Sequence, residues 1–248
     1  MTTLVTGGTK GIGLAIARRL AREGEALVLA FQSDEAAADA ARAELAASGA
    51  IVTTVRADVG DVGGAAQVMD AVARAGGGPL YLVHSAAMIY PTTLLDADLD
   101  KFTRAIQVNG LSLLYLVQKA LPMLDRGSSI VFISSAGARL ATANYAALGA
   151  GKALSESLLR YLVPELAPRG VRINAVAPGL VDTGSVADMV GGVEAAARIL
   201  ERAARSNPSG RLSRDADYAA VVEFLLSPAA EFVQGQVIHV NGGAYVPS

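Results

Sequence analysis

Near the start of the chain, the spacing and surroundings of Gly7, Gly11 and Gly13 are those of a phosphate-binding turn. These glycines occur in Thr6-Gly7-Gly8-Thr9-Lys10-Gly11-Ile12-Gly13, between a strand-like run at 3–6 and a helix-like run at 12–23. Glycines let the backbone turn sharply and approach a ligand, and a helix N-terminus directs free N–H groups and partial positive charge toward phosphate. The turn is therefore predicted to hold a nucleotide diphosphate through Gly7, Thr9, Lys10, Gly11, Ile12 and Gly13. The alternative is a structural strand-to-helix turn that is merely rich in glycine.

A tyrosine and a lysine seven residues apart form a second candidate for chemistry. Tyr145 and Lys152 lie in a predicted helix at 145–164. Seven residues at about 100° each come within about 20° of two full turns, so both side chains share one face, about 10 Å apart along the axis. A nearby ammonium group favours the ionised form of a phenol. The alternative is that Tyr145 only begins the helix and faces solvent or packs locally.

These residues are carried by an alternation of short apolar strands and longer helices. Strands are predicted at 3–6, 26–31, 51–56, 80–84, 129–134, 172–177 and 236–240. Helices are predicted at 12–23, 34–48, 62–75, 99–124, 145–164 and 215–226. Such an order implies parallel β-α-β units with right-handed crossovers. We therefore expect one α/β domain over residues 1–248, a doubly wound parallel sheet of Rossmann type with about seven strands and helices on both faces.

One segment interrupts the alternation. Residues 182–208 follow a strand, begin with small residues and carry scattered apolar side chains. Long segments of this kind over a strand end are often functional, so a substrate lid is predicted, with an ordinary surface helix as the alternative.

Composition excludes several classes of function. The 248 residues include no cysteine and only two histidines, His84 and His239, so disulfides and thiolate metal sites are excluded and no metal site is expected. A net charge of −2 offers no basic surface for nucleic acid. No apolar stretch reaches about 18 residues and no leader pattern opens the chain, so we predict a cytoplasmic protein without a membrane span.

The ends of the strands indicate the cofactor. In a doubly wound sheet, ligands lie beyond the carboxyl ends of the strands. After the second strand no acidic residue occurs before Asp34, whereas Lys10 can supply positive charge for a ribose 2′-phosphate. NADPH is therefore favoured over NADH. The alternative for Lys10 is a solvated loop lysine.

The glycine turn resembles the Thr-Gly-x-x-x-Gly-x-Gly motif of the short-chain dehydrogenase/reductase family, and other motifs agree along the whole chain. The resemblance implies that Asp58 and Val59 meet the adenine, and that Asn109 orders a water near the active lysine. It makes Ser135 the active-site serine. Further cofactor contacts are implied for Ser85, Ala86, Ala87, Lys152, Pro178, Gly179, Val181 and Thr183. The family's Asn-Asn-Ala-Gly is replaced by His84-Ser85-Ala86-Ala87, where His84 is interpreted as a packed residue rather than a ligand.

The position of the tyrosine indicates the type of reaction. Most members of the family carry Tyr-x-x-x-Lys, which would place the tyrosine at Leu148. The spacing from Tyr145 to Lys152 instead resembles the NADPH-dependent enoyl-acyl-carrier-protein reductases of type III. This implies reduction of the carbon–carbon double bond of an enoyl thioester in fatty acid or polyketide biosynthesis, on acyl carrier protein or a related carrier. Tyr145 would stabilise the enolate, with Lys152, Ser135 and Asn109 as the other catalytic residues.

Two alternatives to enoyl reduction stay open. One is a ketoreductase or dehydrogenase of the same family, which acts on a carbonyl or an alcohol. The other is a nucleotide-binding module without turnover. Members of the family commonly assemble, so a homodimer or homotetramer is expected in every case.

Overall fold

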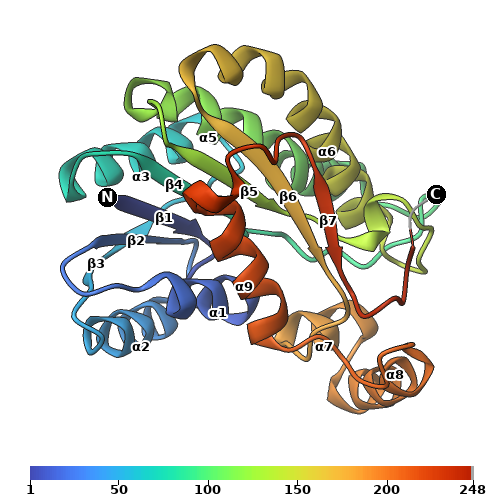
Figure 1. Ribbon diagram of the computed structural model, residues 1–248. Helices are drawn as coiled ribbons and strands as arrows, with labels where there is room; N and C mark the ends of the chain where they lie inside the picture. Colours follow the sequence, from blue (N-terminus) through green and yellow to red (C-terminus); the bar gives the residue numbers. More distant parts are fainter. Residues whose placement is uncertain (247–248) are drawn as a thin grey trace.

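The computed structural model describes residues 1–246, and in them seven parallel strands form one sheet. The order is β3-β2-β1-β4-β5-β6-β7, with every neighbouring pair parallel (Figure 1). The bounds are β1 (Thr2–Thr6), β2 (Ala26–Phe31), β3 (Ile51–Arg56), β4 (Leu80–His84), β5 (Ser129–Ile133), β6 (Arg172–Pro178) and β7 (Val237–Val240). The predicted doubly wound sheet is confirmed. The strand order reverses between β1 and β4, where such folds form their ligand crevice.

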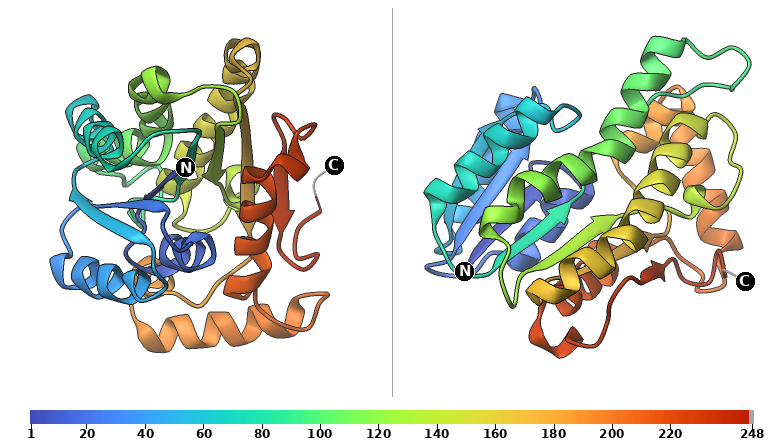
Figure 2. Two further views of the ribbon diagram at one scale, coloured as in Figure 1. Left: turned by 60° about the vertical axis from the view of Figure 1, so that its left-hand side comes forward. Right: turned by 90° about the horizontal axis from the view of Figure 1, so that it is seen from above.

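Helices cover both faces of the sheet. One face carries α1 (Gly11–Leu20), α2 (Glu35–Ala46) and α9 (Asp215–Leu226), and the other carries α3 (Val62–Ala75), α5 (Ser112–Ala120) and α6 (Ala146–Leu166). Figure 2 shows this layering from two further directions. Adjacent residues Leu4 and Val5 belong to different apolar clusters, because successive side chains of a strand point to opposite faces. Both faces are covered, and every residue of β1 and β5 is buried, the threonines of β1 included.

The helix predicted at 99–124 differs from the structure. It is divided into α4 (Leu99–Ile106), a π-helical turn at Gln107–Leu111, α5 and a 3₁₀ turn at Leu121–Met123. The π turn coincides with a close approach to α6, because a Cβ on Gly110 would lie 2.8 Å from the Leu154 side chain. Residue 122 is a proline in the 3₁₀ turn, which accounts for the end of the regular helix there.

The segment predicted as a lid consists of two helices, α7 (Gly184–Val190) and α8 (Val193–Ser206). They lie beyond the carboxyl end of β6, outside the two helix layers (Figure 1). Gly191 and Gly192 join them with φ of +84° and +141°, values that favour glycine. Only Ala196 of α8 is buried. The pair therefore contributes little to the core.

Within residues 1–246, no helix has the length and apolar character needed to cross a membrane. The same residues contain no group of three or more histidine, aspartate or glutamate side chains that could hold a metal ion.

Candidate active site

The glycine turn lies at the point where the strand order reverses, and its geometry requires glycine. Gly7 and Gly11 have φ of +63° and +54°. A Cβ on Gly13 would lie 2.1 Å from the carbonyl oxygen of Gly7, and a Cβ on Gly7 would lie 2.9 Å from Cα of Ala86. The backbone of the turn therefore packs directly against the loop that follows β4.

The helix after this turn has an open N-terminus. Helices α2, α3 and α4 are capped by the carboxylates of Asp34, Asp61 and Asp98, whereas no side chain caps α1 and its first turn carries no acid. Its orphan N–H groups and positive dipole end thus remain available to an anion. The turn and the helix together fit the diphosphate of a dinucleotide.

The charged residues expected near the adenosine form ion pairs and hydrogen bonds within the chain. Nζ of Lys10 lies 3.6 Å from the carboxylate of Asp34, and both groups are exposed. Asp58 accepts hydrogen bonds from Gln32 Nε2 and the Gly60 N–H and is paired with Arg104. These partners outweigh burial and lower the pKa of Asp58. The carboxylate thereby links the ends of β2 and β3 to α4, while the adjacent Val59 is buried.

The loop after β6 contacts both the end of β7 and the glycine turn. Pro178 ends β6, and the N–H of Gly179 donates to Val240 O at 2.9 Å. Val181 is buried, and Thr183 precedes α7. A Cβ on Gly11 would lie 3.8 Å from Cγ2 of Thr183, so this loop approaches the glycine turn.

Tyr145 and Lys152 both reach the carboxyl end of β5. The Tyr145 hydroxyl donates to Ser135 Oγ at 3.1 Å, and Nζ of Lys152 donates to the carbonyl oxygen of Ile133 at 2.7 Å. Tyr145 is the N-cap residue of α6 rather than a residue inside the helix as predicted. The preceding Asn144 has a left-handed φ of +59°, and its carbonyl accepts the N–H of Thr92. The sharp bend at Asn144 therefore directs the tyrosine toward the strand end.

Two glycines provide the space for the tyrosine ring. A Cβ on Gly137 would lie 2.3 Å from Cε1 of Tyr145, and one on Gly149 would lie 3.4 Å from Cδ1. Leu148, at the position where most members of the resembling family have tyrosine, is 5% exposed. The phenol that reaches Ser135 is thus the one at 145.

Burial dominates the electrostatics of the site. It raises the pKa of Tyr145, against the opposing effect of the bond to Ser135. It lowers the pKa of Lys152 from 10.5 to about 7. The Lys152 ammonium also lies 4.5 Å from the centroid of the Phe132 ring. The expected bias of Tyr145 toward the phenolate is wrong for the chain alone: its phenol stays protonated and is a hydrogen-bond donor.

Ser135 is oriented as a further donor. Its Oγ accepts from the N–H of Gly137 at 3.1 Å as well as from Tyr145. Neither bond uses the serine's own proton, which remains available to a ligand.

The turn that carries Ser135 is held by a carboxylate that the sequence analysis missed. Glu156 is 3% exposed and accepts from Ser134 Oγ at 2.7 Å and from Nε of Arg139 at 3.1 Å. It lies one helical turn after Lys152 on the same face. An acidic residue four positions after a candidate lysine, in a largely apolar helix, was the available signal.

Asn109 holds the loop after β4. Its Oδ1 accepts from the N–H of Met88 and its Nδ2 donates to the Met88 carbonyl, both at 2.9 Å. The side chain is buried in the π turn between α4 and α5. The predicted water near the lysine stays a prediction, while the amide has a definite role in fixing this loop.

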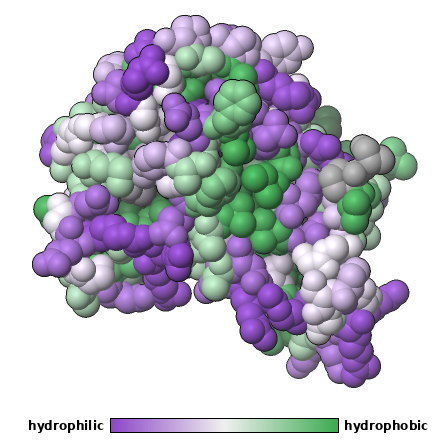
Figure 3. All heavy atoms as spheres, viewed as in Figure 1, coloured by the Kyte–Doolittle hydropathy of each residue, from purple (hydrophilic) through white to green (hydrophobic). Residues whose placement is uncertain are grey.

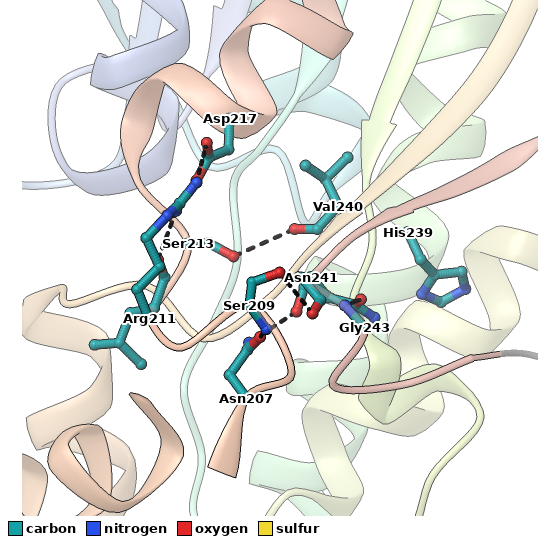
Figure 4. A pocket seen from close by; sticks show the side chains of 11 residues that line it. Asn207, Ser209, Arg211, Ser213, Asp217, His239, Val240, Asn241 and Gly243 are labelled. Carbon is teal, nitrogen blue, oxygen red and sulfur yellow. Dashed lines mark hydrogen bonds and ion pairs between the residues drawn. The ribbon is translucent and has the colours of Figure 1, made fainter. Parts of the chain in front are cut away.

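A separate cavity of about 400 Å³ lies at the carboxyl end of β7 (Figure 4). Many of its polar side chains are paired with each other or with the backbone: Arg211 with Asp217, and Asn207 with Asn241 O. It is lined by residues of 207–217 and 239–243, so Tyr145, Ser135 and Lys152 lie outside it.

Known proteins match the chain over nearly its whole length. Residues 7–245 match a family model described as enoyl-(acyl carrier protein) reductase. A 1-cyclohexenylcarbonyl-CoA reductase of Streptomyces collinus is 32% identical over 243 residues, covering 97% of this chain and 85% of the relative. A 3-oxoacyl-[acyl-carrier-protein] reductase of Staphylococcus aureus is 32% identical over 251 residues, covering 99% and 98%. A cis-4-hydroxycyclohexanecarboxylate dehydrogenase of Sinomonas cyclohexanicum is 37% identical over 243 residues, covering 97% and 94%.

Two solved structures show the same architecture. A short-chain dehydrogenase of Burkholderia cenocepacia in complex with NADP has a TM-score of 0.86 at 32% identity, covering 98% of this chain and 97% of the other. An actinorhodin polyketide ketoreductase variant with NADPH has a TM-score of 0.89 at 28% identity, covering 98% and 96%. The fold, the family model and these relatives define an oxidoreductase built on a sheet of the dinucleotide-binding type. The chain belongs to the short-chain dehydrogenase/reductase family.

Proposed function

We propose that the protein reduces the carbon–carbon double bond of an enoyl thioester, or of a related conjugated carbonyl compound, with NADPH. The observation that carries the proposal is the Tyr145 hydroxyl, seven residues before Lys152 and bonded to Ser135, with a buried leucine at 148. The relative from Streptomyces collinus supports it, because its name describes the reduction of a conjugated thioester.

The residues present would hold the cofactor in three groups. The diphosphate would be held by Gly7, Thr9, Lys10, Gly11, Ile12 and Gly13, and the adenine by Asp58 and Val59. The nicotinamide half would be held by Ser85, Ala86, Ala87, Lys152, Pro178, Gly179, Val181 and Thr183. The bound cofactor supplies a hydride. Lys10 is the cation available to a 2′-phosphate, although Asp34 lies beside it.

The chain's own residues stabilise the charge that develops on the substrate. Tyr145 donates a hydrogen bond to the carbonyl oxygen as it becomes an enolate, and Ser135 supplies a second donor. The raised pKa keeps the Tyr145 proton in place for this role. Lys152 holds the ribose hydroxyls of the nicotinamide nucleotide, and Asn109 fixes the loop beside them. A proton then reaches the α-carbon from solvent or through Tyr145.

The helices α7 and α8 would cover the acyl chain as a lid, spanning residues 182–208. Val193 is 78% exposed and Ile199 is 42% exposed, so apolar side chains are available to a fatty or polyketide-like group. We propose acyl carrier protein or a related carrier as the source of that group.

We also propose that the chain forms a homodimer or homotetramer. Figure 3 shows apolar side chains gathered on the side of the molecule where β6, β7 and α9 lie. The edge strand β7 is only partly buried, and Phe232, just before it, is fully exposed. In the apolar stretches 111–117 and 158–163, Leu113, Leu116 and Leu159 are buried in the chain's own core and are not available to such a surface.

A second candidate function is reduction of a ketone. The hydrogen-bonded pair of Tyr145 and Ser135 can also give a proton to a developing alkoxide, and the relative from Staphylococcus aureus is named for a 3-oxoacyl substrate. Leu148 is the observation against it, since the side chain at that position has no proton to donate.

The experiment compares NADPH oxidation with a crotonyl and an acetoacetyl thioester, and repeats both with NADH. Preference for the crotonyl thioester supports enoyl reduction, and preference for the acetoacetyl thioester supports the alternative. Tyr145→Phe should lower turnover by about 10²–10³, the usual effect of losing one donor to an oxyanion, with NADPH affinity nearly unchanged. NADPH binding without oxidation of any such substrate would instead indicate a silent binding module, and wild-type turnover by the variant would remove Tyr145 from the mechanism.

A further inference from the structure

The imidazole of His84, at the end of β4, is hydrogen bonded at both nitrogens although it is fully buried. Nδ1 lies 2.7 Å from Thr6 Oγ1 on β1, and Nε2 lies 2.7 Å from Ser112 Oγ on α5. The ring also lies against Phe132, with 5.6 Å between the two centroids. A buried ring with two satisfied nitrogens connects the central strand to the helix layer beneath it.

The partners determine which nitrogen carries the proton. Ser112 Oγ donates its single proton to the Val108 carbonyl at 2.6 Å, so it accepts from Nε2–H of His84. Nδ1 is then an acceptor and takes the proton of Thr6. Burial, reinforced by Lys152, lowers the pKa of His84 to about 3, which keeps this neutral form at any ordinary pH.

The direction of the Thr6 proton has a consequence at the crevice. Because that proton points to His84, the lone pairs of Thr6 Oγ1 face the loop after β4. They accept the N–H groups of Ser85 and Ala86, each at 3.2 Å. Gly7, the next residue after Thr6, packs on the backbone of Ala86. His84 therefore acts through one hydroxyl on both walls of the crevice.

We propose that His84 is a positioning residue that fixes the spacing between the glycine turn and residues 85–86, and thereby the affinity for the nicotinamide dinucleotide. The inference rests on the proposed use of NADPH. It also gives a reason why histidine stands at position 84, where the family has the first asparagine of Asn-Asn-Ala-Gly. The imidazole spans the gap from Thr6 to Ser112, so both ring nitrogens and both hydroxyl groups are hydrogen bonded.

The test uses His84→Phe, which keeps an aromatic ring against Phe132 but removes both nitrogens, and Thr6→Val, which removes only the hydroxyl. Each should raise the Kd for NADPH about tenfold, the effect of one lost buried hydrogen bond. The double variant should bind as weakly as either single variant rather than about a hundredfold more weakly, because both act through one hydroxyl. Thr6→Ser should retain the wild-type affinity.

A matched control separates positioning from stability. Ser129→Ala removes another buried hydroxyl of the sheet, one that donates to Leu225 O at the opposite end of β5. It should lower the melting temperature without changing the Kd for NADPH. Wild-type affinity in folded His84→Phe would overturn the inference, and if that variant does not fold, Thr6→Val decides in the same way.

Hydrogen exchange gives a readout that does not depend on the cofactor. In His84→Phe and in Thr6→Val the Ala86 amide should exchange at least about tenfold faster than in the wild type, whereas the Ser85 amide keeps its bond to the Thr6 carbonyl oxygen. If the wild type binds NADPH and the variants match it, the inference fails while the proposed function stands. If the wild type binds no NADPH, the proposed function fails, and unchanged exchange at the Ala86 amide then overturns the inference as well.

Discussion

Gly137→Ala should disable the enzyme because the added methyl group would displace the ring of Tyr145. The φ of Gly137 lies outside the left-handed region, so the backbone accepts alanine without strain. Its new Cβ, however, would lie 2.3 Å from Cε1 and 2.6 Å from Cδ1 of Tyr145, whereas ordinary contact begins at 3.4 Å. The ring must therefore move by about 1 Å, and the hydroxyl leaves its position beside Ser135. A misplacement of about 1 Å can cost about 10² in rate, and such overpacking usually costs about 1–3 kcal/mol of stability.

The assay measures kcat with whichever thioester the wild type reduces, together with the Kd for NADPH and the free energy of unfolding. We expect kcat to fall about 10²-fold while the Kd stays within about twofold. Gly77→Ala is the matched control, because nothing lies within 4 Å of its Cβ position and it should behave as wild type. In a Tyr145→Ala background, Gly137→Ala should cost no further stability. If the Gly137→Ala enzyme keeps the wild-type kcat, the catalytic hydroxyl does not depend on the packing of the Tyr145 ring against Gly137.

Two further predictions concern charge and assembly. The pKa of Lys152 is 10.5 in the unfolded chain and about 7 in the folded one. The free energy of unfolding should therefore rise with pH between these values, by up to about 1.4 kcal/mol per pH unit. Lys152→Met should lose this rise. Urea unfolding of the cofactor-free protein at pH 7, 8 and 9 measures it, and equal slopes for both proteins would contradict the burial of the ammonium. Light scattering should give two or four times the chain mass of 25.3 kDa, and a monomer would leave the partly buried edge strand β7 without the expected partner.

Features that depend on neighbouring residues were predictable from the sequence. Five of the seven strands begin at the predicted residue, and β2, β3 and β4 also end there, because apolar runs between helices identify strands directly. The glycine turn was equally readable, since the left-handed φ at Gly7 and Gly11 is a requirement of the local backbone. The alternation of elements then implied the sheet and the end at which a ligand lies.

Features that depend on distant contacts were decided only by the tertiary structure. Helical spacing placed Tyr145 and Lys152 on one face, but the bend at Asn144 and the space above Gly137 bring the phenol to Ser135. Burial, which no local pattern measures, keeps Tyr145 protonated and lowers the pKa of Lys152. His84 looked like a simple packed residue, yet its role follows from partners 78 positions before it and 28 after it. The local sequence determines which elements form, whereas the chemistry of a buried group depends on residues that only the fold brings within hydrogen-bonding distance.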